Sequence, residues 1–349
     1  MKFITKKEDL QKALSKVTGI SIKHASLPVL NCFLFEAKSG ALSLRATNLN
    51  VGVEVRVRAT VEQDGIFALD AQTITSVISG IKSDEFLTCS LVDSEFHIES
   101  KFRNVTIKTY PYEDFPVLPR LNSENFTCRF ITNDLIDNIK KVSYAASQSD
   151  MKPEIASLYL HSKDGIFYFV CTDGYRLAEK KYRPAFETNC PSLIMPIKNI
   201  IEISRILASC DQDIEFKAYD HMVVFEDEST YITMHIVAGN YPNYETIIPK
   251  DWKQEITILK SDIVEMLRIN QVFSDSLLRL SLETHKESGV VSFLSESQDK
   301  GKSKQDIEAK IDGETSEMIP LTINHKYFSD VINVLSSDSI TLRITEKYL

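Results

Sequence analysis

Apolar residues recur at helical spacing in six segments of the chain, and these segments form three matching pairs. Within each segment they stand three or four residues apart, which predicts an amphipathic helix with one buried face. The predicted helices cover residues 5–17, 71–82, 132–144, 197–208, 260–270 and 323–335. Corresponding residues such as Leu10, Leu135 and Ile263 lie about 125 residues apart, so the chain is predicted to contain three tandem repeats of domain size.

The three helices that open the repeats also carry possible start signals. Each has a Ser, Thr or Asp near its beginning, at residues 5–9, 132–134 and 261–262. Side chains of these types often accept hydrogen bonds from the first free backbone N–H groups of a helix. We therefore expect them to act as N-caps.

Between the helices the apolar pattern changes to a period of two. Valines at every second position from Val51 to Val57 alternate with Gly52, Glu54 and Arg56, as in a half-buried strand. Segments 30–36, 41–47, 157–162 and 165–171 are also predicted strands. Each repeat is thus expected to contain strand, helix and three strands, twice over. Two helices cannot cover both faces of so many strands, so we predict an α+β class, with helices on one side of antiparallel sheet.

Proline-containing segments separate the repeats. The first closes at residues 110–116 with two prolines, and the second closes with Tyr241-Pro242-Asn243-Tyr244. We predict domains at 1–121, 122–250 and 251–349. After its second helix, the third repeat is shorter than the other two by roughly 20–25 residues, about two strands.

Composition and charge limit the functional classes. Hydrophobic residues make up 43% of the chain and charged residues 26%, and no apolar run approaches the ~18–20 residues that span a bilayer. The net charge of −9 opposes nucleic-acid binding unless positive charge gathers on one surface. The six predicted helices together carry a positive net charge. That sign suits a face turned toward a polyanion, although lysine also favours helices without any ligand.

No pattern predicts catalysis, a metal site or a cofactor. The seven histidines are dispersed without metal-binding spacing, and no P-loop, G-x-S-x-G or G-x-G-x-x-G occurs. The six cysteines include no C-x-x-C pair, so we expect reduced, mostly buried thiols in a cytoplasmic protein. A threefold repeat instead favours assembly, because head-to-tail contacts close into a ring when the rotation permits.

Four segments, in order within the threefold repeat, resemble the bacterial DNA polymerase III beta subunit, the sliding-clamp family. They are His24-Ala25-Ser26-Leu27-Pro28-Val29-Leu30, Phe115-Pro116, Cys171-Thr172-Asp173-Gly174-Tyr175-Arg176-Leu177-Ala178 and Tyr241-Pro242-Asn243-Tyr244. The resemblance covers all three repeats. It implies a head-to-tail homodimer that forms a six-domain ring, with helices lining a hole for duplex DNA and sheets outside. Such a ring would tether a polymerase to its template without reading base sequence.

The resemblance also implies a pocket for short peptides with apolar anchors. The partners would be the replicative DNA polymerase alpha subunit, the clamp-loader delta subunit, other polymerases and repair proteins. The matching positions are Ile155, Thr172, Gly174, Tyr175, Arg176, Leu177, Pro242, Thr246 and Ile247. Aliphatic side chains and proline suit a shallow groove, and Thr172 and Arg176 offer hydrogen bonds to an extended ligand. Without the resemblance, the Asp-Gly pair in this segment predicts only a hairpin turn.

The remaining implied positions concern DNA and the dimer. DNA contacts are implied for Lys23, His24, Lys152 and Lys198, with Lys12, Lys16, Lys140 and Lys141 as weaker candidates. At the dimer seam, an edge strand of the first repeat would meet the third repeat through Arg103, Val105, Ile107, Val272 and Phe273. The alternative function is a scaffold that binds peptides without encircling DNA.

Overall fold

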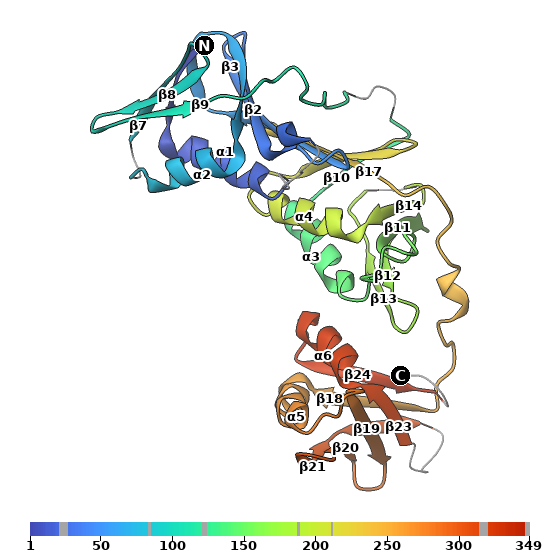
Figure 1. Ribbon diagram of the computed structural model, residues 1–349. Helices are drawn as coiled ribbons and strands as arrows, with labels where there is room; N and C mark the ends of the chain where they lie inside the picture. Colours follow the sequence, from blue (N-terminus) through green and yellow to red (C-terminus); the bar gives the residue numbers. More distant parts are fainter. Residues whose placement is uncertain are drawn as a thin grey trace. The chain divides into compact units, whose positions relative to one another are not determined.

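The computed structural model describes residues 1–20, 27–82, 85–120, 124–186, 189–210, 212–313 and 320–345. The chain forms two compact units, Met1–Tyr241 and Pro242–Leu349. The first unit contains the first two repeats and the second unit contains the third (Figure 1). The predicted α+β class with three tandem repeats is confirmed.

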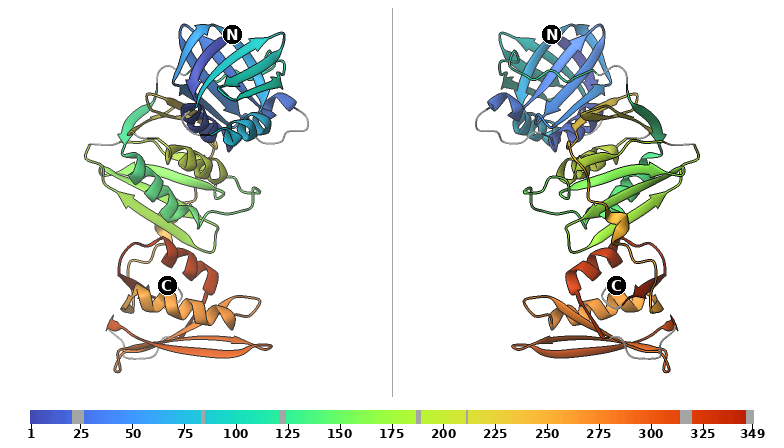
Figure 2. Two further views of the ribbon diagram at one scale, coloured as in Figure 1. Left: turned by 90° about the vertical axis from the view of Figure 1, so that its left-hand side faces the viewer. Right: turned by 90° about the vertical axis from the view of Figure 1, so that its right-hand side faces the viewer.

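In the first repeat, α1 (Lys7–Thr18) and α2 (Ala71–Gly80) pack side by side and against the strands (Figures 1 and 2). Its strands are β1 (Lys2–Lys6), β2 (Cys32–Lys38), β3 (Ala41–Thr47), β4 (Val51–Val57), β5 (Ala59–Gln63), β6 (Gly65–Asp70), β7 (Phe86–Val92), β8 (Glu95–Ser100) and β9 (Arg103–Lys108). A short 3-10 helix, η1 (Pro28–Asn31), precedes β2.

The second repeat has the predicted order of elements, with α3 (Thr132–Ser143) and α4 (Ile197–Leu207) as the helix pair. Its strands are β10 (Phe126–Phe130), β11 (Ser157–Lys163), β12 (Ile166–Thr172), β13 (Leu177–Tyr182), β14 (Leu193–Pro196), β15 (Ile214–Ala218), β16 (Met222–Glu226) and β17 (Thr230–His235).

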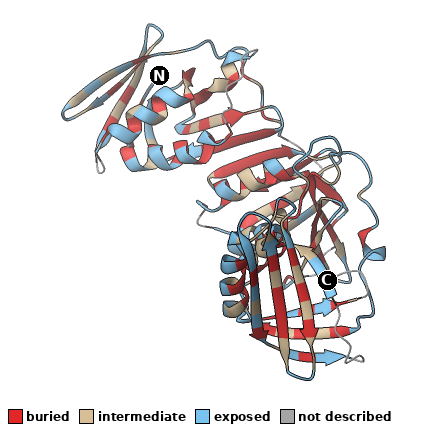
Figure 3. Cartoon of the chain, turned by 60° about the horizontal axis from the view of Figure 1, so that its bottom comes forward, coloured by how far each residue is buried: buried red, intermediate tan, exposed pale blue. Residues whose placement is uncertain are grey.

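The second unit starts with the 3-10 helix η2 (Tyr244–Thr246) and contains α5 (Lys260–Val272) and α6 (His325–Val334). Its strands are β18 (Gln254–Leu259), β19 (Arg279–His285), β20 (Val290–Ser297), β21 (Gly301–Glu308), β22 (Lys310–Gly313), β23 (Pro320–Asn324) and β24 (Ser339–Ile344). Each helix pair has a buried face and an exposed face (Figure 3), as the apolar spacing predicted. None of the described helices has the length and apolar character needed to cross a membrane.

Two strands, β5 and β22, were not predicted. Each follows its predecessor after a single residue, Arg58 or Ala309. β4 and β21 lie in one sheet, whereas β5 pairs with β1 and β22 with β18 in another sheet. A bend at one residue therefore lets one long extended segment contribute a strand to each of two sheets. The alternation of apolar and polar residues continues through the bend, so the sequence pattern does not show where the first strand ends.

The predicted N-caps are wrong for the helices that open the repeats. Helices α1 and α5 follow directly on strands, and α3 follows β10 after one residue. The N-cap residues are therefore Lys6, Ile131 and Leu259, and none of them makes a side-chain cap. Side-chain caps occur instead on second helices. The Asp70 carboxylate accepts a hydrogen bond from Thr73 N at 2.8 Å, and Asn324 accepts one from Lys326 N at 2.9 Å.

A strand pair joins the first two repeats into one body. β4 pairs antiparallel with β17, with Val55 opposite Thr230 and Val53 opposite Ile232. The pair completes an eight-stranded sheet in the order β10-β15-β16-β17-β4-β3-β2-β6. Buried apolar residues of both repeats form one continuous core, and the second unit has its own core around Phe293 and Phe328.

The cysteines provide a test of burial. All six are free, and burial raises the pKa of Cys32 and Cys210 to about 11 and that of Cys89 and Cys128 to about 12. Because the thiolate is the reactive form, native thiols at pH 8 should react with iodoacetamide many-fold more slowly than in urea. Equal rates would contradict this burial.

The same raised pKa values predict a change of stability with pH. Thiols of the unfolded chain lose their protons at lower pH than the buried thiols, so the free energy of unfolding should fall as the pH rises from about 9 to about 11.

Candidate functional site: peptide hairpin, helix face and strand edges

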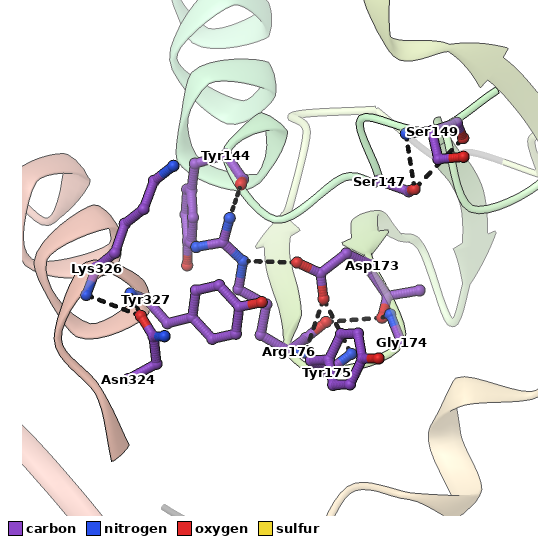
Figure 4. Close-up of polar contacts among 11 residues, drawn as sticks. Tyr144, Ser147, Ser149, Asp173, Gly174, Tyr175, Arg176, Asn324, Lys326 and Tyr327 are labelled. Atoms are coloured by element: carbon purple, nitrogen blue, oxygen red, sulfur yellow. Dashed lines mark hydrogen bonds and ion pairs between the residues drawn. The ribbon is translucent and has the colours of Figure 1, made fainter. Parts of the chain in front are cut away.

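The hairpin between β12 and β13 is held by its own polar side chains. Gly174 has a φ of +89°, a conformation that glycine adopts without strain. The Thr172 hydroxyl donates to Arg176 O at 2.7 Å and accepts from Gly174 N at 3.1 Å. The Asp173 carboxylate accepts from Tyr175 N at 2.9 Å, Arg176 N at 3.0 Å and Arg176 Nε at 3.1 Å (Figure 4). The predicted hairpin turn is therefore present, and its backbone is rigidly supported.

Arg176 also connects this hairpin to the loop between α3 and β11. Its Nη2 donates to Tyr144 O at 2.6 Å, and its guanidinium lies 5.5 Å from the centre of the Tyr144 ring. The same loop contains Ile155, whose carbonyl accepts a hydrogen bond from Ser147 N at 3.0 Å. The structure thus uses Thr172 and Arg176 to build the hairpin, although the sequence suggested them as donors to a ligand.

The apolar candidates are accessible to different degrees. Tyr175 is 87% exposed at the hairpin tip. Leu177, two residues further on, and Ile155, in the loop before β11, are half-buried. An exposed aromatic ring on a rigid turn is a good binding anchor, because little conformational entropy is lost when it is covered. In the second unit, Pro242 and Ile247 flank η2, and Ile247 is 63% exposed. Thr246 ends η2, where its hydroxyl donates to Asn243 O at 2.8 Å.

Two of the lysines predicted to contact DNA lie on or near the helices of the second repeat. Lys152 is exposed in the loop after α3, and Lys198 is exposed in the first turn of α4. The Lys198 ammonium is paired with Asp150, with 2.6 Å between Nζ and Oδ2. The exposure of both partners keeps the pair weak, so Lys198 remains able to exchange Asp150 for a phosphate. Lys23 and His24 lie outside the described residues.

The weaker candidates differ among themselves. Lys12 and Lys140 are exposed, and Lys141 pairs with Asp137 at 2.6 Å. Lys16 is buried, with 8% of its surface exposed, and its Nζ donates to Thr230 Oγ1 at 2.9 Å. The expectation that Lys16 contacts DNA is therefore wrong, because α1 turns this side chain toward β17 of the second repeat.

Helices and linker complete the seam between the first two repeats. Gly19, after α1, lies so close to the Glu202 carboxylate of α4 that a Cβ would collide with it. On the other face, the linker residue Arg120 pairs with Glu54 at 2.6 Å and covers the Tyr231 ring at 3.9 Å. Tyr231 itself donates to Pro119 O at 2.8 Å. The seam thus consists of a strand pair, a helix contact and a covering segment.

Two further strands lie at sheet edges within their units. β9 ends a five-stranded sheet in the order β5-β1-β7-β8-β9, and β21 ends a four-stranded sheet in the order β21-β20-β19-β23. Along β9, Ile107 is buried, Val105 is half-buried, and Arg103 pairs with Glu85 at 3.0 Å. In the second unit, Val272 at the end of α5 is 56% exposed, and Phe273 is half-buried. Both sets of residues predicted for the dimer are thus accessible in part.

Sequence reasoning missed the residues that shape these sites without facing a ligand. Asp173 was within a quoted motif, and its position before glycine was the available signal. Tyr144 and Asp150 gave no signal, because each acts on a residue more than thirty positions away in the chain. Among the described residues, no group of three or more His, Cys, Asp and Glu side chains is arranged to hold a metal ion.

Family models match the three repeats in order. The model of the DNA polymerase III beta subunit N-terminal domain matches residues 1–119, the central domain matches 130–243, and the C-terminal domain matches 245–348.

Curated relatives are similar over nearly the whole chain. The beta sliding clamp of Buchnera aphidicola subsp. Acyrthosiphon pisum is 25% identical over 344 residues, which covers 98% of this chain and 92% of that protein. The beta sliding clamp of Synechococcus elongatus is 24% identical and covers 99% of this chain and 92% of that protein.

Solved structures share the fold. The DNA polymerase III subunit beta of Pseudomonas aeruginosa has a TM-score of 0.91 at 20% identity, covering 99% of this chain and 94% of that one. A sliding clamp from the same organism, solved bound to griselimycin, has a TM-score of 0.92 at 20% identity, covering 99% and 93%.

Proposed function

The chain belongs to the DNA polymerase III beta subunit family, it is a sliding clamp, and we propose that two copies close head to tail into a six-domain ring around duplex DNA. Each subunit contributes three domains, at 1–121, 122–250 and 251–349. The ring works in the cytoplasm as a tether, so it raises the effective concentration of polymerase at the template and needs no catalysis or cofactor of its own.

The strand pair β4·β17 is the observation that supports ring closure. It joins the third strand after the first helix of one repeat to the last strand of the next repeat. The corresponding strands at the two ends of the chain are β21 in the third repeat and β9 in the first. Both are edge strands within their units. Pairing β21 with β9 of a second subunit repeats the internal contact and removes two exposed edges.

Exposed apolar residues support the same contact on the helix side. In the seam between the first two repeats, called here the internal seam, the end of α1 packs against α4, and Ile20 is fully buried. Phe273 has the corresponding place after α5, next to Val272 and two further exposed apolar residues, Ile269 and Leu277. Contact with α2 of a second subunit would cover this patch, as α4 covers the end of α1.

Partner proteins bind, in this proposal, through short peptides with apolar anchors. We assign to them the hairpin and loop residues Ile155, Thr172, Gly174, Tyr175, Arg176 and Leu177, with Pro242, Thr246 and Ile247. The exposed side chains Tyr175 and Ile247 offer apolar surface, and the hairpin backbone is already ordered. The partners are the polymerase alpha subunit, the clamp-loader delta subunit, and other polymerases and repair proteins. The griselimycin-bound relative indicates that a sliding clamp of this fold takes a ligand.

A topological experiment tests encirclement. The chain is loaded onto a nicked circular plasmid with a clamp loader, and the complex is separated by gel filtration. We expect protein to elute with the circle and to be released when the plasmid is cut once, since a ring slides off a free end. The peptide-binding scaffold would give the same elution before and after cutting. The relatives carry the name of a clamp, which favours the ring over the scaffold.

Charge reversal tests the DNA-facing lysines. With Lys152→Glu and Lys198→Glu together, DNA retention should weaken and depend less on salt, by about 0.9 in the slope of log K against log salt for each lost phosphate contact. Solution mass should not change. Lys38→Glu with Lys181→Glu, at exposed lysines on strands, is the matched control. If both double variants weaken retention equally, these lysines act only through net charge.

A further inference from the structure

β9 has the same place in the first repeat as β17 in the second. Each is the last strand of its repeat, and each is followed by a residue that donates to the strand before the second helix. Tyr110 N donates to a β6 carbonyl at 2.9 Å, and Val237 N donates to a β14 carbonyl at 2.8 Å. Counting back from these hydrogen bonds makes Asn104 of β9 the counterpart of Tyr231 of β17.

β21 has the same place in the third repeat as β4 in the first. The capping residues Asp70 and Asn324 precede the second helices, and each lies opposite the first residue of the neighbouring strand, β2 or β19. From these matching positions, the registers can be followed from β2 through β3 to β4 in the first repeat, and from β19 through β20 to β21 in the third. Followed in this way, Lys304 is the counterpart of Glu54. Both side chains leave the strand on the face away from the core.

The internal seam now gives the register of the contact between subunits. Glu54 lies opposite Tyr231 in β4·β17. Its counterpart Lys304 therefore lies opposite Asn104 when β21 pairs with β9 of a second subunit. Asn104 itself lies opposite Glu99 on β8, and both are exposed. Glu99, Asn104 and Lys304 thus form one row across three strands, on the outer face of the sheet.

We propose that Lys304 of one subunit pairs with Glu99 of the partner subunit across Asn104, so that this ion pair adds a charged contact to each seam of the ring. The inference rests on the proposed ring. Neighbouring strands lie about 4.8 Å apart, so β21 and β8 are separated by about 10 Å, within the combined reach of extended lysine and glutamate side chains. The asparagine between them is short and uncharged.

Nearby basic residues already face acidic residues of their own subunit. Arg103 is paired with Glu85 at 3.0 Å. Lys302 lies opposite Glu296 on β20, and Lys108 lies opposite Glu95 on β8. Lys2, near Glu99 on the same subunit, is itself paired with Glu62 at 2.8 Å. These neighbours leave Lys304 as the base of β21 that lies in line with Glu99 across the seam.

Within its own subunit, Lys304 is also close to Asp306, which competes with Glu99 for the lysine. Its Nζ lies 3.6 Å from Asp306 Oδ1, but that oxygen also accepts a hydrogen bond from the Ser292 hydroxyl at 2.6 Å. Lys304 and Asp306 are both more than half exposed, so their pair is weak and easily exchanged. In the seam between the first two repeats, Arg120 of the linker covers Glu54, the counterpart of Lys304, whereas no linker joins two subunits. The proposed pair therefore stays in contact with solvent and should weaken as salt is added.

Sedimentation of the full chain over a range of concentrations tests this pairing by charge exchange. Lys304→Glu and Glu99→Lys should each weaken dimerisation by roughly 5- to 30-fold, since an exposed pair contributes little and a ring has two seams. Lys310→Glu is the matched control, because this exposed lysine lies on β22 and pairs with Asp312. It should leave the dimer unchanged.

Mixing the two single variants gives the sharpest result. In either variant alone, both seams join like charges. In a ring with one subunit of each variant, both seams join opposite charges, so the dimer should return toward wild-type affinity. The double variant Lys304→Glu/Glu99→Lys should recover in the same way.

The outcomes separate the pairing from the ring. A wild-type dimer with no rescue on mixing would overturn the pairing and leave the ring intact. A wild-type chain that stays monomeric at every concentration would overturn both. Rescue on mixing, lost at high salt, supports the pairing, and it also shows that both variants are folded.

Discussion

Substituting aspartate for both Val272 and Phe273 is expected to convert the dimer into a monomer. Val272 is 56% exposed at the end of α5, and the proposed contact with α2 of a second subunit would cover it. Two carboxylates there would lose the apolar burial, about 1.5–3 kcal/mol for each large side chain, and would have no partner in the seam. Since a ring has two seams, dimerisation should weaken by more than about 1,000-fold.

Light scattering provides the measurement. Wild type should approach twice 39.6 kDa, and the double variant should remain near 39.6 kDa at every concentration. Leu259→Asp is the matched control, because Leu259 is also 56% exposed and lies at the opposite end of the same helix. Phe273 is half-buried, so Val272→Asp alone serves as a milder variant with the same direction. A double variant that remains a dimer would refute this seam.

The second large effect concerns partner peptides. Replacing Leu177 and Ile247 together by alanine should weaken binding of a polymerase alpha-subunit peptide by roughly 30- to 1,000-fold, equivalent to about 2–4 kcal/mol. Leu177 begins β13 next to the ordered hairpin, and Ile247 is 63% exposed, so both can lose solvent contact to an apolar anchor. Fluorescence anisotropy of a labelled peptide measures the change.

The control for this experiment uses apolar residues elsewhere. Val92→Ala with Val117→Ala removes similar side chains, which are 53% and 90% exposed. This variant should bind the peptide normally, and both variants should keep the mass of the dimer. Unchanged peptide affinity in the Leu177→Ala/Ile247→Ala variant would remove these residues from the site.

The hairpin shows where a motif and its structure agree only in part. The Asp-Gly pair predicted a turn, and the turn is present with Gly174 at positive φ. Thr172 and Arg176 were expected to offer hydrogen bonds to a ligand, yet they donate to Arg176 O and Tyr144 O. Their side chains shape the backbone that presents Tyr175, because a rigid turn leaves less entropy to be lost on binding.

The sequence by itself determined the six helices, the threefold repeat and the α+β class. Helical and strand periods are local properties of the sequence, so they can be recognised wherever one face of a helix or strand is buried. The tertiary structure alone decided that β4 pairs with β17, that Lys16 is buried against Thr230 and that Arg176 binds Tyr144 O. Each of these contacts joins residues that are far apart in the chain, and local pattern carries no information about which distant groups meet.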